Sequence, residues 1–299
     1  MKLVLQFFFV FIVFSQTIFS QTIPADSLYL GQKLSDSNPE LFLLPVSPGF
    51  FAAERITFSN DGKTIYYSEL NGYFDKARVK YYNYSHNKWN GPYILFEGYF
   101  SPMLTPGNDT IFLQNAADKA TQIWFSIKSG TSWCDPIRFM PDKKLQYLLQ
   151  VTNNGNFYFS SEYSNGGLGK RDWSKLVITG KDTTLQSLGP PLCTSDDDVD
   201  FCVSRNDSVI IIAAKRTETT NKLDLFISYR KNNSSWTTPK NLGPKININN
   251  PNDGRWGPCL TPDNKYLFYT GGWNSPKIYW VRIYNLIDSI KQTNYTPKD

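Results

Sequence analysis

The sequence predicts an all-β protein, a β-propeller of four-stranded antiparallel blades, with five blades preferred and six as the alternative. Two observations carry this prediction. A phrase that joins a turn to a run of aromatic and β-branched residues recurs along the chain, and aromatic residues make up 16% of its 299 residues. Such side chains favour strands, and a turn-and-strand unit repeated every ~50 residues is typical of propeller blades.

The repeated phrase is clearest in SNDGKTIYYSE (59–69) and TPDNKYLFYTG (261–271). Weaker copies begin at Thr105, Thr152 and Ser204, so that successive copies are 46, 47, 52 and 57 residues apart. Each copy follows a short apolar strand and opens with the Pro, Asn, Asp or Gly residues that tight turns require. We therefore expect each copy to be the hairpin that joins the first two strands of a blade.

The remaining strands of each blade can also be placed. A third strand follows every hairpin, and in three blades a fourth is opened by Trp89, Trp133 or Trp236, which we expect in the core. The last blade lacks a fourth strand, but segment 39–45 near the start of the chain has the matching pattern. We expect this segment to pair with 277–284 and close the ring, which leaves no open sheet edge.

The domain organisation is predicted to be simple. Lys2 and an apolar run of about a dozen residues resemble a secretory signal peptide over residues 1–20, cleaved after Ser20. The run is shorter than the ~20 residues of a membrane-spanning helix. A single propeller domain then occupies 21–299. Its expected parts are a closing strand within 28–50, blades near 54–98, 99–143, 144–192, 196–247 and 252–285, and a short helix and tail at 286–299.

Composition excludes several classes of function. The net charge of +5 is spread without a block of Lys and Arg, so no nucleic-acid partner is expected. A single histidine, His86, argues against a histidine zinc site or a Ser-His-Asp triad, and no cofactor or metal is expected. The four cysteines, Cys134, Cys193, Cys202 and Cys259, permit three pairings. Cys193 with Cys202 is the preferred pair, and four buried thiols are the alternative.

Several motifs carry a family resemblance. They are GQKLSDSNPELF (31–42), YSNGGLGKRDW (163–173), the W..P..LG phrase followed by KIN (245–247), and the ending at 262–291. Together they resemble the PD-type, TolB-like β-propeller repeats of exported bacterial proteins, over residues 28–291. The resemblance implies the fold and a periplasmic or secreted location, and an envelope complex stays one option for its partners. It implies little about ligand, because propellers host unrelated functions.

Three turns depart from this family pattern. Asn264 stands where glycine is usual, Gly107 and Asn108 replace Asp-Gly, and Arg205 replaces a proline. These departures leave the geometry of the turns open, and the expected fold is unchanged.

The candidate site lies on the face opposite the repeated hairpins. Loops between blades and loops between second and third strands converge there around the central channel, where a rigid scaffold usually displays function. The candidate ligand-binding residues on this loop-rich face are Glu54, Arg55, Tyr99, Asp198, Asp200, Asp253, Arg255, Trp256 and Trp273.

Each candidate has more than one reading. Trp256 and Trp273 either stack on a sugar ring or pack in the core. The acidic run at 194–201 either holds a hard cation or is a solvated loop, and its spacing matches no EF-hand. Glu54, Asp198 and Asp253 either form the carboxylate pair of a glycosidase or act as hydrogen-bond acceptors. No catalytic residue is assigned.

The sequence therefore predicts an exported, non-catalytic propeller that binds a protein or glycan through its loop-rich face. The alternative is a carbohydrate-active hydrolase or lyase with carboxylates at the channel mouth, and a third option is an envelope scaffold with a broad apolar patch. Two converging acids with shifted pKa values would favour the enzyme, whereas an aromatic and polar platform would favour the binding module.

Overall fold

The structure is a computed structural model. It describes residues 22–72, 75–118, 122–140, 146–162, 164–180, 182–216, 223–231, 235–250 and 253–284. The expected signal peptide and the expected C-terminal helix at 286–299 lie outside these ranges. Within them, none of the helices has the length and apolar character needed to cross a membrane.

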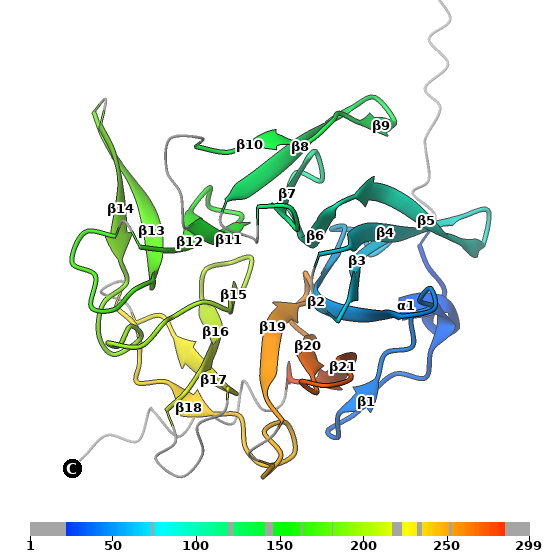
Figure 1. Ribbon diagram of the computed structural model, residues 1–299. Helices are drawn as coiled ribbons and strands as arrows, with labels where there is room; N and C mark the ends of the chain where they lie inside the picture. The colour runs from blue at the N-terminus through cyan, green and yellow to red at the C-terminus, as the bar shows by residue number, and fades with distance from the viewer. Residues whose placement is uncertain are drawn as a thin grey trace, which may run out of the picture.

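Five antiparallel sheets are arranged around a central axis (Figure 1). The first blade contains β2 (Phe50–Phe58), β3 (Thr64–Asn71), β4 (Ala77–Ser85) and β5 (Lys88–Glu97). The second contains β6 (Tyr99–Leu104), β7 (Thr110–Asn115), β8 (Ile123–Ser129), β9 (Ser132–Trp133) and β10 (Ile137–Arg138). The third contains β11 (Gln146–Val151), β12 (Phe157–Ser161), β13 (Asp172–Thr179) and β14 (Asp182–Ser187).

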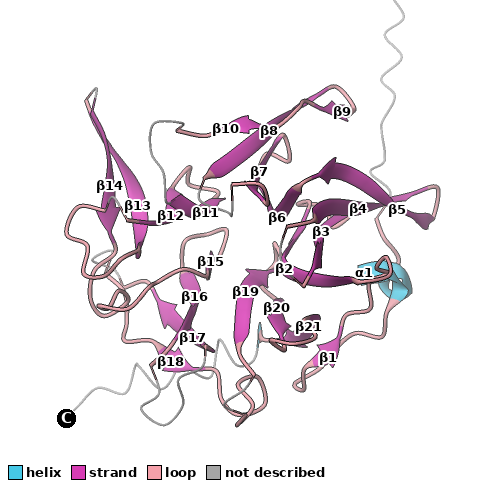
Figure 2. Cartoon of the chain, in the orientation of Figure 1, coloured by secondary structure: helices cyan, strands magenta, loops and turns pink. Residues whose placement is uncertain are grey.

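The fourth and fifth blades complete the ring. The fourth contains β15 (Phe201–Val203), β16 (Val209–Ala214), β17 (Asp224–Tyr229) and β18 (Lys240–Asn241). The fifth contains β19 (Arg255–Leu260), β20 (Tyr266–Gly271), β21 (Lys277–Arg282) and, from the other end of the chain, β1 (Glu40–Leu41). The helical residues described are the short turns η1 (Ala25–Ser27) and α1 (Leu28–Gly31) together with Tyr284, so the chain is almost entirely strand and loop (Figure 2). This confirms the all-β, five-bladed propeller.

The N-terminal segment closes the ring as expected. Glu40 pairs with Trp280 and Leu41 with Tyr279 in antiparallel register. Beyond β1, the side-chain amide of Gln32 donates to the carbonyl of Leu43 and accepts from its N–H, both at 2.9 Å. The amide thus satisfies backbone groups that a further strand would otherwise pair with, which protects this edge.

The repeated hairpins have one shared geometry, which explains the repeated phrase. The Ser or Thr that opens each copy accepts a hydrogen bond through its hydroxyl from the second strand in four blades, for example from Thr64 N to Ser59 Oγ at 2.8 Å. The residue three positions later has a left-handed backbone in every blade. These residues are Gly62, Asn108, Gly155, Asp207 and Asn264, with φ between 58° and 72°. Asn and Asp tolerate this conformation better than other non-glycine residues, so the departures at Asn108 and Asn264 keep the turn.

The core lies between the faces of neighbouring blades. Where the fifth blade meets the first, Phe58 and Tyr67 pack with Phe268 and Trp280 in one buried cluster. Trp236 is 4% exposed, and Trp89 and Trp133 pack partly buried against the cores of their blades. The blades thus hold each other rigidly, and they set the positions of the inner strands that line the channel.

Candidate functional site

Bulges at one height of the channel create a ring of inward positions. The inner strands β6, β11 and β19 lose register with their neighbour at the same point of the repeat, and β2 loses it one residue earlier. The bulged residues have positive φ: Glu54 (66°), Ser101 (49°), Leu148 (43°) and Gly257 (57°). Asp200, directly before β15, occupies the matching position in the fourth blade. Bulges re-aim side chains and are frequent next to functional sites.

Gly257 lets two of these strands come together. A Cβ atom on Gly257 would lie 2.9 Å from the carbonyl carbon of Glu54 and 3.0 Å from its oxygen. Real Cβ atoms do not approach backbone so closely, so only glycine allows β19 to pass this close to the bulge of β2. The strained conformation of Glu54 is thereby held against its neighbour.

Consecutive residues of β19 hold two carboxylates in the channel. The indole N–H of Trp256 donates to Glu54 Oε1 at 3.0 Å, and the backbone N–H of Gly257 donates to Asp200 Oδ2 at 3.3 Å. The carbonyl of Glu54 also accepts from Thr270 Oγ1 at 3.0 Å. The structure thus brings together Glu54 and Asp200, whereas the pairings proposed from the sequence involved Glu54, Asp198 and Asp253.

The two acids perturb each other. Burial raises the pKa of Glu54 to about 8, and the charge of Asp200 adds to the rise, while the Trp256 N–H and Arg55 oppose it. Burial also raises the pKa of Asp200, against the opposing charge of Arg55. Both residues keep part of their surface open to the channel, although protein surrounds them. At neutral pH the pair therefore retains a proton, as expected for neighbouring carboxyl groups in a poorly solvated site.

Arg55 lies inside the channel wall and not at its rim. Its side chain is 0% exposed, its guanidinium lies 5.0 Å from the centre of the Phe201 ring, and Nη2 donates to the Phe201 carbonyl. Among the described residues, Nε and Nη1 have no hydrogen-bond partner. The guanidinium is therefore the buried counter-charge of the acid pair.

An aromatic platform stands beside the acids at the loop-rich mouth. Trp273, in the loop between β20 and β21, stacks on Trp256 with 4.5 Å between ring centres and 8° between planes. Trp256 is 5% exposed and Trp273 is 45% exposed. A Cβ on Gly254 would lie 2.3 Å from the Trp273 ring, so this glycine lets the indole lie flat. Of the two candidate tryptophans, Trp273 offers the open ring face and Trp256 connects it to Glu54.

Arg255 and Asp253 form a largely buried ion pair beside this mouth. Arg255 is 4% exposed and pairs with Asp253 at 2.7 Å. Its Nε donates to the carbonyl of Ile246 at 3.0 Å, and its guanidinium lies near the rings of Tyr269 and Tyr279. These contacts position the start of β19, which carries Trp256.

The acidic run does not act as one cluster. Asp197 forms an ion pair with Arg171 at the surface. Asp198 is 2% exposed and accepts from the N–H of Thr194 at 2.9 Å, and burial raises its pKa to about 7. Of the acids in this run, Asp200 is the one whose charge acts on Glu54 in the channel. Across the described ranges, no three His, Cys, Asp or Glu side chains are grouped as metal ligands would be.

Tyr99 lies apart from this site. Its ring contacts Phe96 and Trp124, with 6.1 and 5.6 Å between ring centres. It therefore contributes to the packing of the first two blades.

The channel is closed in its middle and has a different second mouth. Cys202, Cys259 and Gln150 line an internal cavity of only about 10 Å³. At the hairpin face, turns from four blades and the N-terminal segment surround a cavity of about 530 Å³. Arg205 spans this side, donating from Nη2 to the Phe58 carbonyl at 2.9 Å and from Nη1 to the side chain of Asn60. The departure from proline is the sequence signal that marks Arg205, since proline has no such reach.

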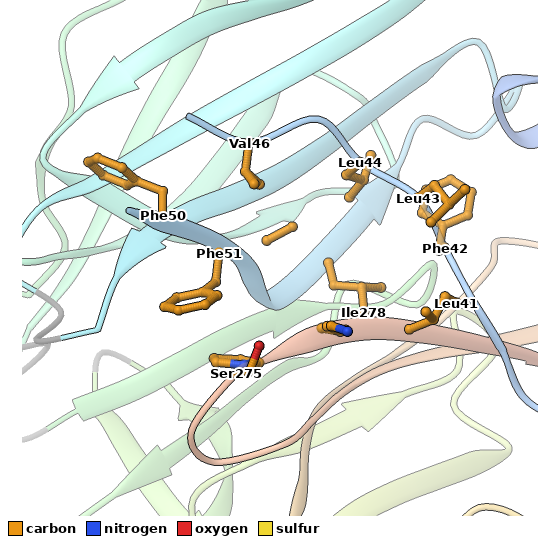
Figure 3. Close-up of a pocket in the computed structure, with 12 residues that line it drawn as sticks. Leu41, Phe42, Leu43, Leu44, Val46, Phe50, Phe51, Ser275 and Ile278 are labelled. Carbon is orange, nitrogen blue, oxygen red and sulfur yellow. The ribbon is translucent and has the colours of Figure 1, made fainter. Parts of the chain in front are cut away.

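An apolar groove of about 260 Å³ lies at the junction of the fifth and first blades (Figure 3). The segment that follows β1 forms one side and the start of β21 the other. Leu41, Leu43 and Val46 are 40%, 69% and 41% exposed there, and Phe51 and Ile278 also line the groove.

The fold and this channel define the class: a five-bladed β-propeller with one polar, aromatic mouth and one mouth where the hairpin turns surround a cavity. No family model matches the chain, and no curated protein matches it significantly. TolB proteins are among the solved structures that are similar to it. TolB from Acinetobacter baumannii has 11% identity and a TM-score of 0.47, covering 76% of this chain and 53% of that one.

Two further structures show the same level of likeness. An oligogalacturonate lyase in complex with manganese has 12% identity and a TM-score of 0.42, covering 79% of this chain and 66% of that one. A nidogen/laminin complex has 12% identity and a TM-score of 0.42, covering 79% and 82%. The chain spans about half the length of the TolB chain that it matches. These likenesses concern the fold.

Proposed function

We propose that the protein is an exported, non-catalytic binding module that holds a glycan at the loop-rich mouth of its channel. The observation that carries the proposal is the exposed indole of Trp273, held flat on Trp256 beside the carboxyl of Glu54. The leader-like pattern of residues 1–20 supports export, and the single ring of blades supports one propeller domain over 21–299.

The chemistry of this mouth suits a sugar. The apolar C–H face of a sugar ring stacks well on an indole, and the hydroxyl groups find acceptors and donors in Asp253, Glu54 and Asp200. Of the protein and glycan ligands that the sequence leaves open, a glycan fits better, because one open ring face beside polar groups matches the size of a single sugar. The stacked pair is already formed, so little ordering is needed on binding.

Titration with oligosaccharides tests the proposal. The purified chain is titrated with oligosaccharides of hexoses, N-acetylhexosamines and uronic acids, followed by tryptophan fluorescence and calorimetry. We expect Trp273→Ala to weaken binding by about tenfold or more, a typical loss for one anchoring aromatic. Tyr93→Ala is the matched control, because Tyr93 is 49% exposed on the outer strand β5. Absence of binding to every oligosaccharide, or equal losses in both variants, would refute the glycan proposal.

The acid pair favours a second candidate, a carbohydrate-active hydrolase or lyase. Two neighbouring carboxyl groups with raised pKa values are what general acid–base catalysis requires. One of the two would then act as the acid and the other as the base.

The two functions separate in one assay. Any oligosaccharide that binds is incubated with the protein, and its products are followed by chromatography. An enzyme should lose turnover in Glu54→Gln and Asp200→Asn while substrate binding persists. A binding module should leave the oligosaccharide intact in all variants. Turnover that survives both substitutions would exclude the acid pair as its source.

A further inference from the structure

Two cysteines meet where the fourth and fifth blades touch at the channel. Cys202 is the central residue of β15 and Cys259 lies near the end of β19, so both are on innermost strands. Their side chains are 2% and 3% exposed, and both line the small internal cavity. All four cysteines of the chain are free thiols. The pair preferred from the sequence is not formed, since the Cys193 thiol instead donates to the Trp173 carbonyl at 3.3 Å.

Both sulfurs contact the backbone of Leu260, which brings the two cysteines close together. The backbone N–H of Leu260 donates to the sulfur of Cys202 at 3.2 Å, which brings the residue next to Cys259 against Cys202. The Cys259 thiol lies 3.5 Å from the Leu260 carbonyl. Each thiol also shifts the pKa of the other, as neighbouring titratable groups do. Such a contact joins strands that are 57 positions apart in the chain, in different blades.

The surroundings make the two thiols unequal. The sulfur of Cys202 is stabilised as a thiolate by the Cys259 thiol, by the buried guanidinium of Arg55 and by the Leu260 N–H, which lowers its pKa. The contact with Cys202 raises the pKa of Cys259, and burial adds to the rise. In the folded protein these contacts hold the two sulfurs near each other, and in the open chain each sulfur reacts as a thiolate, the nucleophile in thiol–disulfide exchange.

We propose that Cys202 and Cys259 are a redox pair, oxidised to a disulfide that links the inner strands of the fourth and fifth blades. The Cys202 thiolate attacks a sulfur of a small-molecule disulfide and displaces one small thiolate. The Cys259 thiolate then attacks the Cys202 sulfur of this mixed disulfide and displaces the second. The protein loses two protons and two electrons, and the small disulfide is reduced to two thiols. This proposal does not depend on the ligand at the loop-rich mouth.

Burial determines when the reaction takes place. With both sulfurs nearly inaccessible in the closed ring, exchange occurs while the chain is open, during folding in an oxidising compartment or during reversible unfolding. Once the ring has closed, the linkage is protected from reductants. The link closes a loop of roughly 60 residues, and loops of this size give large stabilisation in the chain-entropy account.

The test compares refolding with and without oxidant. The full chain is refolded from denaturant with either glutathione disulfide or a reducing agent, alkylated, digested and mapped by mass spectrometry. We expect a Cys202–Cys259 cross-link only with oxidant, and a thermal midpoint higher by about 5–10 °C than in the reduced protein. Native protein treated with the same oxidant should cross-link at least tenfold more slowly than the refolding chain.

Cysteine variants provide the controls. A variant lacking the other two cysteines, C134S/C193A, should keep both the cross-link and the oxidant-dependent shift. Cys259→Ala should lose both, and circular dichroism establishes that it is folded. A cross-link between Cys193 and Cys202, no cross-link at all, or a cross-link that leaves the thermal midpoint unchanged or lowers it would overturn the proposal. Because C134S/C193A retains the pair, the result does not depend on the folding of Cys259→Ala.

Discussion

The two mouths of the channel are built from the same repeat but behave as opposites. At the hairpin face, five turns share one geometry, and Arg205 reaches from the fourth blade to the carbonyl of Phe58 in the first. At the loop-rich face, the inner strands bulge, Glu54 has a strained backbone and a carboxyl with a raised pKa, and Trp273 is 45% exposed. The contrast shows that the repeated turn sequence maintains the fold at the hairpin face. Residues that depart from the repeat provide the acidic and aromatic side chains at the loop-rich face. Four substitutions test this contrast.

Among the four substitutions, the largest effect should come from Gly257→Ala. The new Cβ would meet the backbone of Glu54 at 2.9 Å, and the residue has a positive φ of 57°, so we expect a loss of about 3 kcal/mol in unfolding free energy. Gly155→Ala at the hairpin face is the control, since its φ is 72° with open space around it, and it should cost about 1 kcal/mol. Denaturant titration measures both, and equal losses would contradict the tight contact of β19 with β2.

Arg205→Ala should cost somewhat less, about 2 kcal/mol, because it removes charge-assisted hydrogen bonds between blades. Chemical denaturation measures the loss. Arg216→Ala is a control of the same type, because Arg216 donates to the carbonyls of Pro191 and Leu192 without reaching across the channel. If Arg205 links the fourth blade to the first, only Arg205→Ala should speed hydrogen exchange at the Phe58 strand end. Unchanged exchange there would show that Arg205 does not hold this strand end.

The pH dependence of stability should reflect the acids of the loop-rich face. The pKa of Glu54 is raised from 4.5 to about 8, so its contribution to stability is complete below about 4.5 and is lost as pH rises through about 8. Asp198, raised to about 7, acts in the same direction. The thermal midpoint of the protein should therefore fall between pH 5 and 9.

Glu54→Gln isolates one of these contributions. It should flatten the upper part of the profile by a few degrees and leave the part due to Asp198, as measured by scanning fluorimetry in matched buffers. A profile identical to that of the unmodified protein would mean that Glu54 titrates normally.

The smallest effect on stability should be that of Trp273→Ala. Because its ring is largely open to solvent, we expect a loss of at most about 0.5–1 kcal/mol, including the stacking on Trp256. Trp236→Ala offers the opposite case, since this indole is 4% exposed and its removal should cost about 3–5 kcal/mol. Thermal unfolding of both variants measures the difference. A large loss in Trp273→Ala would make this residue part of the framework rather than the binding surface.

Sequence reasoning succeeded where the information is local. The hairpin turn requires a Ser or Thr at its start and a residue that tolerates a left-handed backbone three positions later. The hairpins could therefore be predicted from the sequence alone. The closing strand could be inferred from a blade that lacked its last element. Both predictions rest on a repeated unit, in which each copy supports the interpretation of the others.

The candidate site could be predicted only in part, because it depends on contacts between distant strands. Glu54 and Asp200 were recognised as candidates, but their pairing follows from the bulge of β2 and from the passage of β19 at Gly257. Nothing in the local sequence shows that Trp256 is covered and Trp273 open, since that depends on the stacking of one ring on the other. One signal was present: Asp200 and Gly257 each stand four residues before the Ser or Thr that opens their hairpin.

The pairing of β1 with β21 also governs how the protein is made. Glu40 of β1 and Trp280 of β21 are 240 positions apart. Strand β1 is therefore synthesised early and cannot pair until nearly the whole chain has been made. Such long-range pairing raises the contact order and slows folding. A chain that ends before β21 has no partner for β1. The backbone groups of β1 would then stay unpaired, and proteases and chaperones that act on incompletely folded chains could bind them.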